Sequence, residues 1–149
     1  MTGIQQLEPL QSMARCNADQ AARDLGQALA RKAQLDRQMA ELVRYRADYR
    51  EELRRAMSQS LRIDQAQAYR NLLERLDGAI ERQQALLDTQ VTACEQARHR
   101  YLDRQARLQA FDQLIQTRRK AEQVRQAVRE QHLLDDLTQS RWRLARSMS

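Results

Sequence analysis

Apolar side chains recur at every seventh position over two long stretches of the chain. This spacing is typical of long helices that pack as a coiled coil. The C-terminal stretch carries Leu73, Ile80, Leu87, Cys94, Tyr101, Leu108 and Ile115. A companion set, four residues before each of these, is Tyr69, Leu76, Gln83, Gln90, Ala97, Arg104 and Phe111. The two sets together predict one helix over about residues 65–122, with a continuous seam along one side.

A second heptad track lies upstream and predicts another helix, over about residues 5–57. Its members are smaller on average: Leu7, Ala14, Ala21, Ala28, Leu35, Leu42, Tyr49 and Ala56. Between the two helices, Ser58, Ser60 and Asp64 are all residues that cap helix N-termini. We therefore expect the connecting turn at about residues 58–64, centred near Leu61.

The two tracks match each other if the helices fold back antiparallel. The numbers of facing residues then sum to about 122. Leu42 faces Ile80, and toward the open end a small residue such as Ala21 faces a large one, Tyr101. We therefore predict an all-α fold, a long two-helix antiparallel coiled-coil hairpin. Polar seam members such as Gln90 are expected to weaken this seam and to discourage other registers.

The segment of about residues 123–149 has no partner helix in this arrangement. It combines many arginines with scattered apolar residues that include Val124, Leu137 and Trp142. We expect a basic C-terminal extension that overhangs the first helix, is helical in part and becomes ordered on binding. Residues 1–149 together are expected to form a single coiled-coil domain.

Composition favours few, long elements and argues against an enzyme. The 149 residues include only 3 Gly and 1 Pro, which leaves little material for the turns of a sheet. An extended coiled coil cannot enclose a deep substrate pocket. The sequence also has no nucleophile elbow, no glycine-rich phosphate loop and no metal-ligand spacing. We therefore expect no enzymatic activity, no catalytic residues, no cofactor and no metal.

Charge and cysteine content narrow the class of partner and the compartment. The formal net charge of +6 favours acidic partners, but acidic residues are interspersed among the arginines as on a salt-bridged, solvated helix face. Cys16 and Cys94 have no redox or metal spacing, and the antiparallel register holds them too far apart to pair. The sequence shows no signal peptide and no apolar run that could span a membrane. We expect a soluble, intracellular protein with reduced thiols.

Several short motifs occur in order along the chain. They are Ala21-Ala-Arg-Asp-Leu-Gly26; Leu42 with Tyr45, Tyr49, Arg50 and Leu53; Tyr69 with Leu76, Ala79 and Ile80; Arg107-Leu-Gln-Ala110; and Glu130-Gln131 with Asp135-Asp136. In order and spacing they resemble the FliJ family of flagellar type III export proteins, along nearly the whole chain. Members are two-helix antiparallel coiled coils similar to the central stalk of rotary ATP synthases. The chain departs from the family at Ala66, where members commonly have tryptophan, and at Leu72, where they have an aromatic residue.

The resemblance implies a non-enzymatic cytoplasmic stalk or adaptor of the flagellar export apparatus, peripherally associated with the inner membrane at the flagellar base. Its implied partners are the hexameric export ATPase, the cytoplasmic domain of the membrane-bound export gate, and export chaperones; no small-molecule substrate is implied. The gate-binding surface of the family maps onto Gln38, Leu42, Tyr45, Tyr49, Leu72, Leu76, Ala79 and Gln83.

Alternative functions are open at this stage. An injectisome stalk protein would have the same fold. A basic nucleic-acid-binding coiled coil would account for the net charge, and its affinity would fall steeply as salt is raised. A peripheral membrane binder is favoured least, because only the weakly periodic segment between Val124 and Leu144 could lie on a lipid surface.

Overall fold

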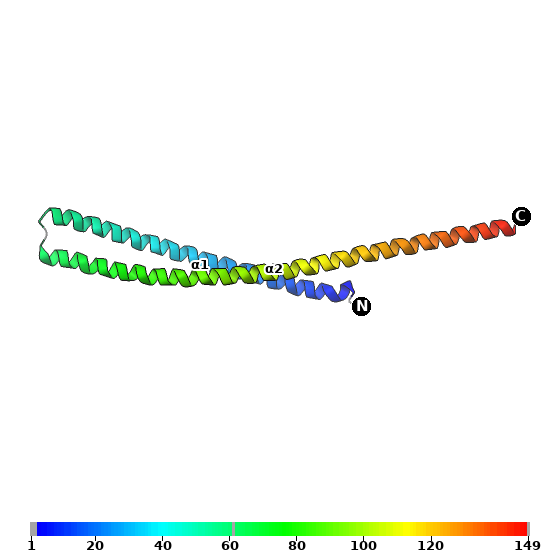
Figure 1. Ribbon diagram of the computed structural model, residues 1–149, viewed down its shortest axis with the longest axis horizontal. Coiled ribbons are helices and arrows are strands. Elements are labelled where there is room, and N and C mark those ends of the chain that lie inside the picture. Colours follow the sequence, from blue (N-terminus) through cyan, green and yellow to red (C-terminus); the bar gives the residue numbers. More distant parts are fainter. Residues whose placement is uncertain (1–2, 61, 149) are drawn as a thin grey trace. The chain divides into compact units, whose positions relative to one another are not determined.

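The computed structural model describes residues 3–60 and 62–148 as two long α-helices (Figure 1). Helix α1 runs from Ile4 to Ser58 and helix α2 from Ile63 to Ser147, and the described residues contain no strand. The heptad pattern therefore predicted the fold class and the order of the elements correctly. Leu61, the expected centre of the turn, lies outside the described residues.

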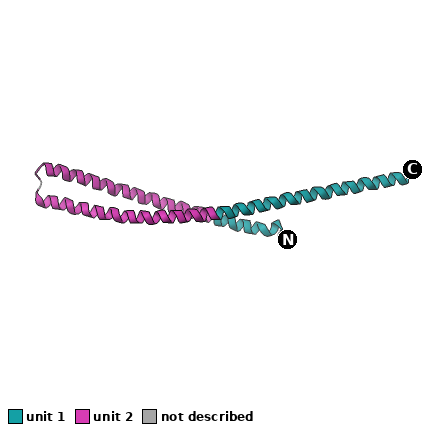
Figure 2. Ribbon diagram, viewed as in Figure 1, with its two compact units in different colours: residues 1–18, 104–149 teal, residues 19–103 magenta. Residues whose placement is uncertain are grey.

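Contacts between the helices divide the chain into two compact units, and each unit contains parts of both helices (Figure 2). One, which we call the turn unit, is Asp19–Asp103; the other, the terminal unit, is Met1–Ala18 with Arg104–Ser149. Within each unit a segment of α1 packs antiparallel against a segment of α2. That the whole chain forms a single domain stays a prediction.

The heptad positions supply the core of both units. Every residue of the two tracks and of the companion set is buried or half-buried. The buried apolar side chains of the turn unit are Ala21, Leu35, Leu87, Cys94 and Ala97, and those of the terminal unit are Leu7, Ala14, Ala18 and Ile115. Many of these side chains are small, so each removes little apolar area from water and contributes little stability by itself. The seam stabilises the fold because it is long, so that many small contributions add up.

Hydrogen bonds between the helices hold the register of the turn unit. Gln90 donates from Nε2 to the backbone carbonyl of Ala28 at 2.9 Å, and Gln83 donates to the carbonyl of Leu35 at 3.0 Å. Both glutamine side chains are buried. A buried amide without a partner is costly, so these bonds compensate for its desolvation and favour one register over its neighbours. The residue numbers in both pairs sum to 118, about one helical turn from the expected sum of about 122, because each long glutamine side chain reaches a carbonyl one turn away from the residue it faces.

In the terminal unit the helices are paired only as far as the N-terminal part of α1 reaches. Gln11 donates a hydrogen bond to Asp112, and Arg119 pairs with Glu8 at 3.5 Å. From residue 121 to residue 148 every position is exposed, yet α2 continues to Ser147. The structure therefore corrects the expectation of a helix end near residue 122 and of a partly helical extension. The sequence contains no Gly or Pro after Gly78, so nothing in it stops the helix where the packing ends.

The connection between the helices is shorter than the predicted turn. Ser58 is the last residue of α1, where its hydroxyl donates to the carbonyl of Arg55 at 2.7 Å, and α2 begins at Ile63. Asp64 therefore lies in the first turn of α2 and is not its N-cap. A carboxylate there interacts favourably with the positive end of the helix dipole. Ser60 has a φ of 65°, in the left-handed region.

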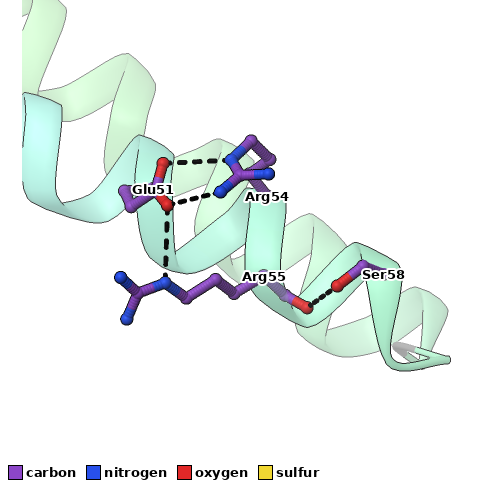
Figure 3. A network of polar contacts seen from close by, with 4 residues as sticks. All are labelled: Glu51, Arg54, Arg55 and Ser58. Atoms are coloured by element: carbon purple, nitrogen blue, oxygen red, sulfur yellow. Dashed lines mark hydrogen bonds and ion pairs between the residues drawn. The ribbon is translucent and has the colours of Figure 1, made fainter.

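A polar cluster stabilises the last turns of α1 (Figure 3). The Glu51 carboxylate accepts hydrogen bonds from Arg54 at 3.0 and 2.6 Å and pairs with Arg55 at 3.4 Å. The hydrogen bonds from Arg54 lower the pKa of Glu51 below its ordinary value. The stabilisation is therefore complete above the pKa of an unfolded glutamate and is lost as pH falls through the lowered pKa. Because the cluster is exposed, water and salt screen it and its contribution is small.

We expect the substitution Ser60→Gly to raise the free energy of unfolding by about 0.5–1 kcal/mol, since glycine adopts a positive φ without steric cost. Denaturant unfolding followed by circular dichroism measures this change. The control is Gln59→Gly, at a neighbouring position without a positive φ. It should lower stability by a similar amount, because glycine there only adds freedom to the unfolded chain. A loss of stability in Ser60→Gly would contradict the turn geometry.

The substitution Gln90→Leu should raise the free energy of unfolding by about 1 kcal/mol, because apolar burial replaces a desolvated amide. It should also relax the register, so that associated species appear in sedimentation velocity. Gln96→Leu, at an exposed position of the same helix, is the control and should do neither. A less stable Gln90→Leu variant would show that the bond to Ala28 contributes more than the apolar burial replacing it.

Candidate functional site

The surface predicted to bind a partner lies entirely in the turn unit. It consists of two stripes, one on each helix. The α1 stripe is Gln38, Leu42, Tyr45 and Tyr49, and the α2 stripe is Leu72, Leu76, Ala79 and Gln83. In both stripes successive residues are four, three and four positions apart, so each stripe follows one side of its helix. We call these eight residues the patch.

The structure joins the two stripes at one end of the patch. Gln83 donates from Nε2 to Oε1 of Gln38 at 3.2 Å. Because the helices run antiparallel, the α1 stripe continues from this bond toward Tyr49 while the α2 stripe continues toward Leu72. The geometry is therefore compatible with one continuous surface contributed by both helices.

An ion-pair group on the other flank of the seam fixes the side on which the patch lies. Asp77 of α2 accepts a hydrogen bond from Arg46 at 3.2 Å and lies 4.0 Å from a guanidinium nitrogen of Arg50. At 100° per residue, Tyr45 on α1 and Ala79 on α2 project from the opposite flank. The patch therefore occupies a flank that these ion pairs leave uncovered.

Burial of the seam changes at the boundary of the patch. Leu35 and Leu87 are buried, and so is Gln83. Between Gln83 and the turn, the seam residues are only half-buried: Leu42, Tyr49, Leu73, Leu76 and Ile80. The patch therefore begins where the well-packed part of the seam ends. Apolar area that the hairpin itself does not cover is available to a binding partner.

Tyr45 is the most exposed large side chain of the patch. It lies beside the seam, 53% of its surface is exposed, and Gln38 two turns away is also exposed. Tyr49 lies in the seam and is half-buried. An exposed tyrosine next to half-buried apolar residues is typical of the residues that dominate binding energy in protein interfaces. More than half of the Tyr45 side chain therefore faces solvent.

A second apolar surface of the turn unit was not identified from the sequence. It is a shallow hollow of about 470 Å³ whose apolar lining includes Leu25, Leu29, Val91, Cys94 and Leu102. Leu29 and Leu102 are each about half exposed. The signal in the sequence is the presence of apolar residues at Leu29 and Val91, directly beside the seam positions, where charged residues are more usual.

Features of other chemistries are few in the described part of the chain. It contains no cluster of three or more residues that could hold a metal ion. Cys16 is exposed, Cys94 is buried in the seam, and both are free thiols. Among the described residues, no helix has a stretch long and apolar enough to cross a membrane.

Comparison with known proteins identifies one family. Residues 3–147 match the family model described as flagellar FliJ protein, which covers nearly the whole chain. This match confirms the resemblance seen in the short motifs. No curated protein and no solved structure matches the chain significantly.

Proposed function

The chain belongs to the FliJ family of non-catalytic flagellar export components, and from this we propose that it acts as a stalk and adaptor linking the export ATPase to the export gate. The observation that carries the proposal is the patch. Family membership implies a gate-binding surface, and the residues implied lie on one flank of the hairpin where its own packing is incomplete. The family match also favours a flagellar role over an injectisome stalk.

The patch supports binding to the cytoplasmic domain of the gate. It offers Tyr45 and Tyr49 of α1 as aromatic anchors, and Leu76 and Ala79 of α2 as apolar contacts. Leu72 replaces the aromatic residue common in the family and presents less area, which should weaken that single contact by about 1 kcal/mol. The binding energy of this interface should therefore depend more strongly on the two tyrosines.

The end of α2 in the terminal unit supports a contact with the ATPase ring. From residue 121 the helix is fully formed as far as Ser147, and every position up to residue 148 is exposed. The large apolar side chains in this segment, all exposed, are Val124, Val128, Leu133, Leu134, Leu137, Trp142, Leu144 and Met148. An isolated helix with this many exposed apolar residues is stabilised when another surface covers them. We assign that surface to the central opening of the hexameric ATPase.

Two further roles follow from the same proposal. Export chaperones would be a third class of partner, held close to the ATPase and the gate. The contact with the gate would place the protein at the cytoplasmic side of the inner membrane, at the flagellar base. Neither role requires an enzymatic activity of this chain.

Double substitution Tyr45→Ala with Tyr49→Ala should abolish measurable binding to the purified cytoplasmic domain of the cognate export gate. The loss of two aromatic anchors corresponds to about 2–4 kcal/mol of binding free energy. Calorimetry measures the affinity, and circular dichroism checks that the variant keeps its helix content. Tyr101→Ala, in the same unit but outside the patch, is the control. Unchanged affinity in a folded double variant would exclude the patch as the gate-binding surface.

Removal of residues 121–149 should eliminate stimulation of the export ATPase and leave gate binding intact. The segment has no packing partner within the described chain, so the rest of the protein should unfold at an unchanged temperature. ATP turnover is measured with the full chain and with the truncated chain at two salt concentrations, with an unrelated RNA as control ligand. Full stimulation by the truncated chain would contradict the assignment. Tight, salt-sensitive RNA binding without any ATPase response would favour the nucleic-acid alternative.

A further inference from the structure

Two rows of opposite charge border the patch. On α2, Arg75 and Arg82 lie two turns apart, each three or four positions from Ala79 of the patch. On α1, Glu41 and Asp48 have the same spacing and lie four and three positions from Tyr45. All four charged side chains are exposed. We call the arginines the basic wall and the carboxylates the acidic wall.

The four wall residues make no ion pair with other described residues of the chain. Within the described residues, the ion pairs of this region involve Asp77, bound by Arg46 and Arg50 on the other flank, and Glu51, bound by Arg54 and Arg55. None of the wall residues has an ion pair or a side-chain hydrogen bond in the described structure. Charges that no group of the chain neutralises can be used by a partner.

The surface beside the basic wall is hollowed. A hollow of about 510 Å³ is lined by Asn71, Glu74, Arg75, Gly78 and Arg82. Gly78 contributes no side chain. A Cβ added at Gly78 would lie 3.4 Å from Nη1 of Arg82. Glu74 lines the hollow too, from the side away from Leu72 and Ala79. Asn71 and Gly78 project opposite the seam, so the hollow lies on the side of the basic wall away from the patch, along the outer face of α2.

We propose that the patch and its two walls receive a single helix of the partner, which carries apolar residues on its contact face, carboxylates along one edge and basic residues along the other. The carboxylates lie toward Arg75 and Arg82, and the basic residues toward Glu41 and Asp48. This inference rests on the proposed function, since the partner is taken to be the export gate. It adds the chemistry and the orientation of the partner segment. It also assigns a role in partner binding to the four wall residues, which lie outside the patch.

The spacing of both walls is what favours a helix over an extended peptide. Residues seven apart on a helix are about 10.5 Å apart, which is two helical turns of a partner lying alongside. The half-buried residues Leu42 and Leu76 lie between the walls, where a third helix could pack its apolar side chains as in a three-helix coiled coil. An extended strand would instead need an exposed sheet edge, and the described chain has no strand.

The two walls determine orientation more than affinity. Exposed ion pairs are individually weak, but a helix bound in the reverse direction would place like charges against each wall. In coiled coils, flanking charges of this kind select the partner and its direction. The patch then supplies the affinity, and the walls exclude segments of the wrong polarity.

The test measures binding of the full chain to the purified cytoplasmic domain of the export gate. The double variant Arg75→Glu with Arg82→Glu should bind at least about tenfold more weakly at low salt and should lose the salt dependence of the wild type. Arg75→Gln with Arg82→Gln should be intermediate. The matched control is Arg37→Glu with Arg44→Glu, which makes the same change of charge at the same spacing on the face of α1 opposite the seam. It should bind within about twofold of wild type.

The outcomes separate this inference from the proposed function. If the wild type does not bind the gate domain, the proposed function fails and the inference fails with it. If wild type and control bind, but the basic-wall variant binds equally well with full helix content, only the inference is overturned. Selective loss in the basic-wall variant supports it. A four-residue exchange that adds Glu41→Arg and Asp48→Arg should recover part of the lost affinity, because a reversed partner helix then meets complementary walls. No recovery would overturn the orienting role of the walls.

Discussion

Close packing of small side chains along an antiparallel heptad seam is the constraint on which the rest of this structure depends. Alanine positions on α1 allow the helices to approach each other, and they allow buried Gln90 to reach the backbone carbonyl of Ala28. Gln83 makes the equivalent bond to Leu35 at the edge of the patch. These two bonds connect packing with function, because they fix the register, and the register determines which residues of the two helices share a flank.

Most of the fold could be predicted from the sequence, because a heptad repeat is both long and strict. Strict repetition from Leu73 to Ile115 predicted the second helix, and the matching track upstream predicted its antiparallel partner. The end of α2 was predicted wrongly: the heptad track stops at Glu122, whereas the helix continues to Ser147. A heptad pattern indicates where helices pack against each other, and a helix can continue beyond that point. The start of α2 was placed two residues late because Asp64 was taken as a cap.

The candidate site was less accessible from the sequence. The residues of the patch came from a family resemblance, and the heptad pattern gave no reason to distinguish Leu42 from Leu35, which both occupy the same track. Their difference in burial depends on how far apart the helices lie at each level, and this is a property of the assembled hairpin. The charged walls could not be predicted from either helix alone, because only the antiparallel register brings Arg75 and Glu41 to the same flank.

The unbroken course of α2 limits how the length of such a chain can change. Within the turn unit, one residue inserted between Gln83 and Gln90 would rotate every position on one side of it by about 100° relative to α1. One of the two glutamines would then leave the seam, and the apolar track would turn toward solvent. Only an insertion of seven residues in α2, matched by an insertion of seven in α1, would preserve both hydrogen bonds and the seam between them. Related chains should therefore differ in the length of this unit by whole heptads, gained or lost in pairs.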